Sequence, residues 1–336
     1  MDRPRETEFR PDPRLPWTQT TTELLRESFQ RIVTQVKTVS FDVFDTALQR
    51  IVHPKEVFAL VEAEAVKAFG KQLGGFADKR IQAEVRARKK QRQAAGHSEI
   101  NLEAIYAELG QAQPAWLPFA NDLLELEFAQ ELRCNRAHPL GWKLWQSAAS
   151  AGRQVCFISD MYLGEARIKR LLEAGGYTDP RVFCSGDLGC NKTSGQLFHL
   201  VAEQLGLQPE EILHIGDNIV SDQQQAQLCG CKSLPFPAPV EAPQQAKHLP
   251  SVGPENLVAA VSSGIIRRQN SSHTWAVATT EDPAVKKGAA YQIGYSTLGP
   301  VTYGLCHWLA ERIATEKRDL VLFLGRDGYL PHKILT

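Results

Sequence analysis

Asp42 is the first residue in the chain whose type and place suggest chemistry. It directly follows an apolar, strand-like segment, residues 36–41. A carboxylate at the tip of a buried strand is costly unless a metal ion or a lysine pairs with it. Held there, it can attack phosphorus or carbon and form a covalent ester, which divides a hard hydrolysis into two easier steps. By itself, Asp42 could equally be a turn residue or a helix N-cap.

Three later motifs offer groups that would complement such a nucleophile. Ser159, followed by Asp160, ends a second strand-like segment, and its hydroxyl could donate a hydrogen bond to a phosphoryl oxygen. Lys192, in a loop before a predicted helix, could neutralise the nucleophile and an anionic substrate. Asp217 and Asp222, five residues apart behind a glycine, could meet one Mg²⁺ ion. Each motif alone is weak, but their order along the chain predicts one site.

The elements that would position these residues are short apolar runs alternating with amphipathic helices, a pattern typical of a parallel sheet covered on both faces. In such sheets the ligand crevice lies outside the carboxyl ends of the strands. We therefore predict an α/β fold, a Rossmann-like doubly wound parallel sheet with the candidate residues at one edge. The strand-like segments are residues 36–41, 154–158, 182–184, 212–215 and 320–324.

A long helical stretch separates the first two strands. Helices are predicted over residues 55–69, 76–93 and 118–132, and a further helix begins after Asn101, a favourable N-cap. One covering helix would need far fewer residues, so residues 51–134 should form an all-helical cap domain inserted after the first strand.

The remaining organisation follows from composition along the chain. Residues 31–50 and 135–235 would form the core, and residues 1–30 a polar tail and a lead-in helix, with no signal peptide. Residues 236–283 contain a proline-rich linker. Residues 284–336 are interpreted as a helical segment and the onset of a truncated second α/β unit, since a lone strand cannot bury itself.

Overall composition limits the class of protein. Lys plus Arg and Asp plus Glu both number 38, so no net field would recruit nucleic acid. No apolar run approaches the ~18 residues that a membrane span requires. The odd number of cysteines, 7, favours reduced thiols and a cytoplasmic location.

Two further groups of residues have simple structural interpretations. His214 falls within a predicted strand and is interpreted as a core histidine with satisfied hydrogen bonds. Arg80, Glu84 and Arg88 are spaced at i, i+4 and i+8, which predicts a ladder of ion pairs along one helix.

The ordered motifs resemble those of the haloacid dehalogenase (HAD) superfamily over about residues 36 to 235. The resemblance implies that Asp42 is the nucleophile and that the Phe44 carbonyl joins Asp42, Asp217 and Asp222 in holding Mg²⁺. It also implies a helical cap in the first insertion position and catalytic roles for Ser159 and Lys192. We expect Thr46, Ser159, Asp160 and Lys192 to bind substrate.

The sequence departs from the family phosphatases at one position. Those enzymes carry a second Asp two residues after the nucleophile, which acts as general acid and base. This chain has Phe44 there, and an acid appears one residue later, at Asp45. A side chain one residue on points in a different direction, so Asp45 is not an equivalent of the missing acid, although it is our candidate for the acid and base role. Haloacid dehalogenases also have an aromatic residue at this place, because a halide leaves without a proton.

A finer resemblance concerns residues 41–46, 158–163, 298–300 and 323–329, which are similar to a bacterial HAD subgroup associated with glycosyltransferases of surface-polysaccharide synthesis. It implies a phosphorylated sugar substrate and a glycosyltransferase partner. We expect a Mg²⁺-dependent phosphatase acting on a small phosphorylated metabolite. The alternatives are a carbon–halogen hydrolase and a catalytically weak module that binds a phosphorylated glycan.

Overall fold

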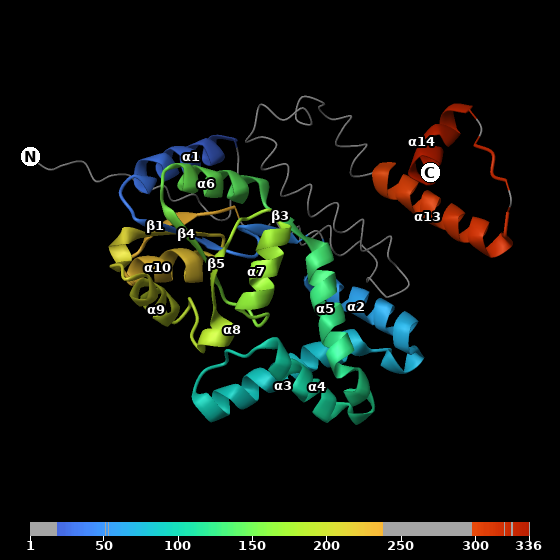
Figure 1. The fold of residues 1–336 in the computed structure, drawn as a ribbon, viewed down its shortest axis with the longest axis horizontal. Coiled ribbons are helices and arrows are strands. Elements are labelled where there is room, and N and C mark those ends of the chain that lie inside the picture. Colours follow the sequence, from blue (N-terminus) through green and yellow to red (C-terminus); the bar gives the residue numbers. More distant parts are fainter. Residues whose placement is uncertain are drawn as a thin grey trace, which may run out of the picture.

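The computed structural model describes residues 19–50, 52, 54–237, 298–318, 320–323 and 325–335. Its centre is a five-stranded parallel sheet in the order β5-β4-β1-β6-β7 (Figure 1). Four of these strands match predicted segments, and the short edge strand β7, which ends in a proline, was missed. The strands are β1 (Thr38–Asp42), β4 (Gln154–Ser159), β5 (Arg181–Cys184), β6 (Ile212–Gly216) and β7 (Lys232–Pro235).

The sheet is covered on both faces, as a doubly wound fold requires. Phe157 of β4 belongs to the hydrophobic cluster that includes residues of α1 (Gln19–Val33), α6 (Pro139–Ser150) and α7 (Glu165–Ala174). The next residue, Ile158, belongs to a cluster with α9 (Gln196–Leu205) and α10 (Gln225–Leu228). Because successive strand residues point to opposite faces, the alternation confirms the predicted α/β Rossmann-like fold. Short helical segments complete the core: α8 (Ser185–Leu188), η3 (Pro209–Glu211) and η4 (Ile219–Gln224).

Register brings the candidate residues to one edge of the sheet. Asp42, the last residue of β1, pairs with Ile158, so Ser159 lies one residue beyond it on the adjacent strand. On the other side, Phe41 pairs with Ile215, and Gly216 follows. Parallel strands end at a common edge, so these motifs meet there.

A mainly helical insertion follows the first strand. It begins and ends in a small antiparallel pair that was not predicted, β2 (Leu48–Arg50) with β3 (Asn135–Ala137). Asn101 caps α4 by accepting a hydrogen bond from the Ala104 N–H. The insertion contains α2 (Pro54–Phe69), η1 (Lys71–Leu73), α3 (Phe76–Ala95), α4 (Leu102–Ala112), η2 (Pro114–Phe119) and α5 (Ala120–Cys134) (Figure 1).

The expected ion-pair ladder on α3 is present, but it is only part of a larger buried group. Arg80 pairs with Glu84 at 2.8 Å, and Arg88 pairs with Glu84 at 2.8 Å. Arg80 also makes a two-pronged pair with Glu127 of α5, at 2.7 Å for each hydrogen bond, and both side chains are 0% exposed. The hydroxyl of Tyr106 donates to Glu127 at 2.9 Å. Three helices of the insertion are therefore joined through one buried carboxylate.

The C-terminal prediction was wrong in part. Helix α13 (Gly299–Glu316) agrees with the helical pattern, but residues 320–323 form no strand, and Leu320 and Leu322 are exposed. No neighbouring strand is available in the described part of the chain to pair with this segment, and α14 (Gly325–Leu335) follows it directly. The tail at 1–18 and most of the predicted linker and helical segment, residues 238–297, lie outside the described residues. None of the helices that the structure describes is long and apolar enough to cross a membrane.

Candidate active site

The three acidic residues predicted to share a metal ion lie together. Asp42 ends β1, Asp217 follows β6, and Asp222 lies on η4. One oxygen from each carboxylate lies within 4.8 Å of the others. Gly216 makes this possible, because a Cβ at that position would collide with the carboxylate of Asp222. The sequence spacing thus correctly predicted that these carboxylates converge.

Lys192 lies between two of these carboxylates. Its ammonium group pairs with Asp42 and, at 2.6 Å, with Asp222. The side chain is buried, and the loop that carries it is fixed by Asp160, which accepts the backbone N–H of Lys192 at 2.9 Å. Asp160 was expected to contact substrate, and the structure shows it holding the lysine loop. Ser159, at the end of β4, is buried one residue beyond Ile158, the residue that pairs with Asp42.

The segment that follows Asp42 supplies three more predicted residues. The Thr46 hydroxyl donates to Asp217 at 3.4 Å. Asp45 has a left-handed backbone with φ 61°, and its charge is close enough to Asp217 to raise that residue's pKa. The ring of Phe44 lies 4.0 Å from the guanidinium carbon of Arg50.

The electrostatics of the site show an excess of negative charge. Burial raises the pKa of Asp42 well above its ordinary value, with Lys192 opposing and the other two carboxylates adding to the rise. Burial, together with the charges of Asp222 and Asp45, raises the pKa of Asp217 to about 7. Asp222 differs from the other two carboxylates. Burial raises its pKa, but Lys192 and His214 lower the pKa by more, so Asp222 stays ionised. One lysine does not balance this many acids.

The donor set suits a hard divalent cation. Mg²⁺ is bound through carboxylate and carbonyl oxygens together with water and substrate oxygens. Three carboxylates within reach of one point supply such donors, and a bound cation would offset the charge that Lys192 leaves unbalanced. The residues present therefore fit the metal that the sequence predicted.

Several residues around the site were not identified from the sequence as functional. His214, interpreted only as a core histidine, contacts Asp222 with Nε2 at 3.3 Å. Arg50 makes a buried two-pronged pair with Glu131 of the insertion, at 3.2 Å for each hydrogen bond. Asn191, next to Lys192, donates to Glu99 at 2.9 Å. For His214 the sequence did contain a signal, namely a polar residue at a strand position that should be apolar. The other contacts join segments far apart in sequence.

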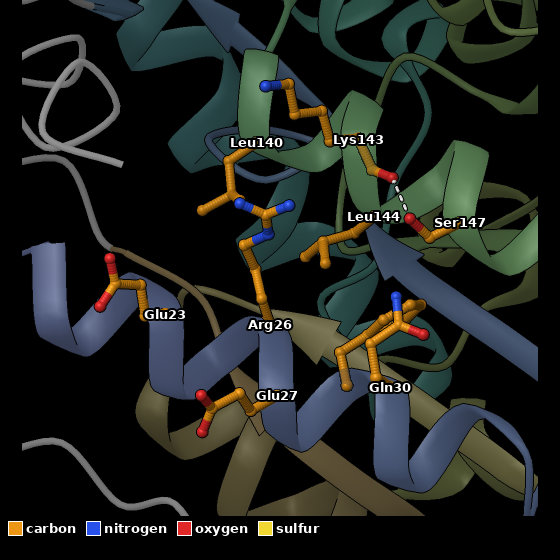
Figure 2. Close-up of a pocket in the computed structure, with 9 residues that line it drawn as sticks. Glu23, Arg26, Glu27, Gln30, Leu140, Lys143, Leu144 and Ser147 are labelled. Carbon is orange, nitrogen blue, oxygen red and sulfur yellow. Dashed lines mark hydrogen bonds between the residues drawn. The ribbon is translucent and has the colours of Figure 1, made fainter. Parts of the chain in front are cut away.

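A surface pocket lies elsewhere on the core, between α1 and α6 (Figure 2). Its volume is about 510 Å³, and its charged side chains are of both signs: Glu23 and Glu27 with Arg26 and Lys143. None of its lining residues belongs to the cluster at the strand ends. We therefore place the candidate active site at the strand ends and not in this pocket.

Several solved structures are similar to this chain at low sequence identity. A 2-haloacid dehalogenase from Pseudomonas syringae pv. tomato is 17% identical, with 60% of this chain and 86% of that chain covered and a TM-score of 0.45. The Xanthobacter autotrophicus L-2-haloacid dehalogenase with chloropropionic acid covalently bound is 16% identical (64% and 82% covered, TM-score 0.43). A predicted phosphoglycolate phosphatase from Haemophilus somnus is 14% identical (60% and 85% covered, TM-score 0.39).

No curated protein matches the sequence. The family described as haloacid dehalogenase-like hydrolase matches residues 36–230, more than half of the chain, and this range contains the nucleophile candidate, the lysine and the acid cluster. The chain therefore belongs to the haloacid dehalogenase-like hydrolases and is a hydrolase.

Proposed function

We propose that the protein is a Mg²⁺-dependent phosphomonoester hydrolase acting on a small phosphorylated metabolite, such as a sugar phosphate. The observation that carries the proposal is the cluster of Asp42, Asp217 and Asp222 around a single ammonium group, that of Lys192. A site of this kind needs added positive charge at the place where a phosphate dianion would bind. A divalent cation supplies it.

In the first step Asp42 attacks phosphorus. Its Oδ1 is held by Lys192, so Oδ2 is the oxygen available to form the new bond. The bond from phosphorus to the substrate's leaving oxygen breaks as the aspartyl phosphate forms, and the leaving alkoxide takes up one proton. Ser159 and the backbone N–H groups after β4 donate hydrogen bonds to the phosphoryl oxygens, while Lys192 balances their charge.

In the second step water attacks phosphorus, the bond to Asp42 breaks, and inorganic phosphate leaves. Asp45 is the group proposed to give the proton to the alkoxide and then to take one from water. Its charge acts on both Asp217 and Arg50, which supports a location beside the reacting groups. Asp42, Asp217, Asp222 and the Phe44 carbonyl would hold Mg²⁺, which when bound neutralises developing charge on the phosphoryl oxygens.

Hydrolysis of a carbon–halogen bond is the second candidate, and Phe44 is the observation that favours it. In that reaction Asp42 attacks carbon, the halide leaves with the bonding electrons, and water then hydrolyses the ester without any need for an acid at residue 44. Arg50 is a cation that lies over this ring, but its Nε and Nη2 donate to Glu131 of the insertion. Its guanidinium is thus already paired with a carboxylate of the protein.

Panels of phosphate esters and 2-haloacids, assayed with and without Mg²⁺, separate the candidates. We expect phosphate release that requires Mg²⁺ and disappears in Asp42→Asn. Halide release that does not depend on metal would instead establish the dehalogenase. Thermal stabilisation by phosphorylated glycans without any turnover would establish a binding module, in keeping with the proposed glycosyltransferase partner.

A further inference from the structure

His214 is an unusual residue for the middle of a buried parallel strand. It lies on β6 with 0% exposure, directly opposite Ser40 of β1, which is also 0% exposed. Burying two polar side chains in the centre of a sheet is costly unless their hydrogen bonds are made. Ser40 Oγ lies 2.9 Å from His214 Nδ1, and His214 Nε2 lies 3.3 Å from Asp222 Oδ1. Ser40 and His214 therefore connect the interior of the sheet to the acid cluster through two hydrogen bonds.

The hydrogen on Nε2 has only one chemically consistent arrangement. Both oxygens of Asp222 accept hydrogen bonds from other donors, Oδ1 from the ammonium group of Lys192 and Oδ2 from the backbone N–H of Asn218, so this carboxylate is an acceptor. The shared hydrogen must then belong to His214, on Nε2. In the neutral imidazole Nδ1 is the acceptor, and the Ser40 hydroxyl is placed to donate to it. Ser40 therefore favours the form of His214 that donates to Asp222.

Asp222 is also held by other groups, including the Ser221 hydroxyl, which donates to Oδ1 at 3.5 Å. Its Oδ1 also receives the ammonium group of Lys192 at 2.6 Å, and its Oδ2 receives the backbone N–H of Asn218 at 3.0 Å. Gly216 presses against the carboxylate and leaves no room for a side chain. His214 and Lys192 share one oxygen, so the position of that oxygen determines where the lysine lies between Asp222 and Asp42.

We propose that His214 is a positioning residue for the active site: by donating Nε2–H to Asp222, it fixes the carboxylate that orients Lys192 on the nucleophile. The inference deepens the proposed function and rests on it for the roles of Lys192 and Asp42. Residues that hydrogen-bond to a metal ligand and orient it, without contacting the metal themselves, typically contribute 10- to 100-fold to metal affinity or activity. We expect a loss of about that size when the donor to Asp222 is removed.

Two conservative variants separate the Nε2 contact from the rest of the side chain. A glutamine amide nitrogen reaches the place of Nε2, whereas an asparagine amide reaches only the place of Nδ1. His214→Gln therefore keeps the donor to Asp222, and His214→Asn keeps only the contact with Ser40. We expect the affinity for Mn²⁺, measured calorimetrically without substrate, to fall by about 10- to 100-fold in His214→Asn. It should stay near that of the wild type in His214→Gln.

The protonated nitrogen can be read directly in the intact wild-type protein by ¹⁵N NMR of its histidines, with His214→Gln used for assignment. A hydrogen on Nε2 supports the inference, and a neutral ring protonated on Nδ1 overturns it. Equal Mn²⁺ affinities for folded His214→Gln and His214→Asn would also overturn it. If the wild type binds no divalent cation, the metal part of the proposed function fails. In that case the NMR result alone decides the inference. The NMR result also decides it alone if His214→Asn does not fold.

Discussion

The carboxylate of Glu99 accepts a hydrogen bond from the side chain of Asn191 at 2.9 Å, and Asn191 directly precedes Lys192. Glu99 belongs to the segment between α3 and α4 of the helical insertion, whereas Lys192 belongs to the core. The insertion thus contacts the very loop that presents the lysine to the nucleophile. A cap that closed over substrate would act on the site through this contact.

Glu99→Ala tests this connection. This variant removes a partly buried hydrogen bond between the lysine loop and the insertion. Loss of such a bond to a carboxylate corresponds to about tenfold in an equilibrium or rate constant. We expect kcat/KM for the preferred substrate to fall by about that factor. The matched control is Glu103→Ala, which removes another pair between insertion and core, Glu103–Arg167 at 2.8 Å, away from the lysine loop. Equal losses in the two variants would contradict a specific role for Glu99.

Phe44→Asp tests whether the missing general acid limits the reaction. A positioned acid contributes about 10²–10⁴-fold, and its benefit is greatest for strongly basic leaving groups. In a series of aryl and alkyl phosphates, the wild-type rate should depend steeply on the leaving group's pKa, and Phe44→Asp should flatten that dependence. Phe44→Asn has a similar size without the proton. If both variants behave alike, residue 44 does not supply the acid.

Much of this site could be predicted because its residues are tied to strand ends. Asp42, Ser159 and Asp217 each follow an apolar run, and parallel strands bring such positions to one edge whatever the intervening sequence. The contacts of Arg50 with Glu131 and of Glu99 with Asn191 could not be predicted, since they depend on how the insertion packs on the core.

The local sequence pattern also gave wrong predictions where tertiary contacts determine the secondary structure. Residues 320–323 have the apolar composition of a strand but no neighbour to pair with, whereas the short strand β7 forms beside β6 despite its polar start. His214 was correctly placed in the core, yet its contact with Asp222 depends on the turn that brings η4 back over the strand end.

His138 should make stability depend on pH. It caps α6 by accepting the N–H groups of Leu140 and Gly141 on Nδ1, and burial lowers its pKa from 6.5 to about 4. Between these values the unfolded chain binds the proton more readily than the folded one. The stabilisation that depends on neutral His138 is therefore fully present above pH 6.5 and is lost as the pH falls towards 4. The total loss in the free energy of unfolding is about 3 kcal/mol.

His138→Asn keeps an N-cap acceptor but cannot titrate. Denaturant unfolding of both proteins between pH 4 and 7 isolates the histidine, because all other groups are shared. The wild type should lose more stability on acidification than the variant. Parallel pH profiles would show that the histidine is not the source of the pH dependence.

The buried pair of Arg80 and Glu127 should dominate the stability of the insertion. Glu127→Ala leaves a fully buried guanidinium without its main partner, at a cost of about 3–5 kcal/mol in the free energy of unfolding. Arg80→Met combined with Glu127→Leu removes both charges and should recover much of this loss. Glu84→Ala is the matched control, since that carboxylate is partly exposed and should contribute about 1 kcal/mol or less. A Glu127→Ala protein as stable as Glu84→Ala would contradict this account.

Trapping the covalent intermediate tests the role of Asp42 most directly. The protein is mixed with a hydrolysed phosphate ester and Mg²⁺, quenched in acid during turnover, digested and examined by mass spectrometry. The proposed function predicts one phosphoryl group on the peptide that contains Asp42, absent without metal and absent in Asp42→Asn. Steady phosphate release with an unmodified Asp42, or with the phosphoryl group on another residue, would contradict it.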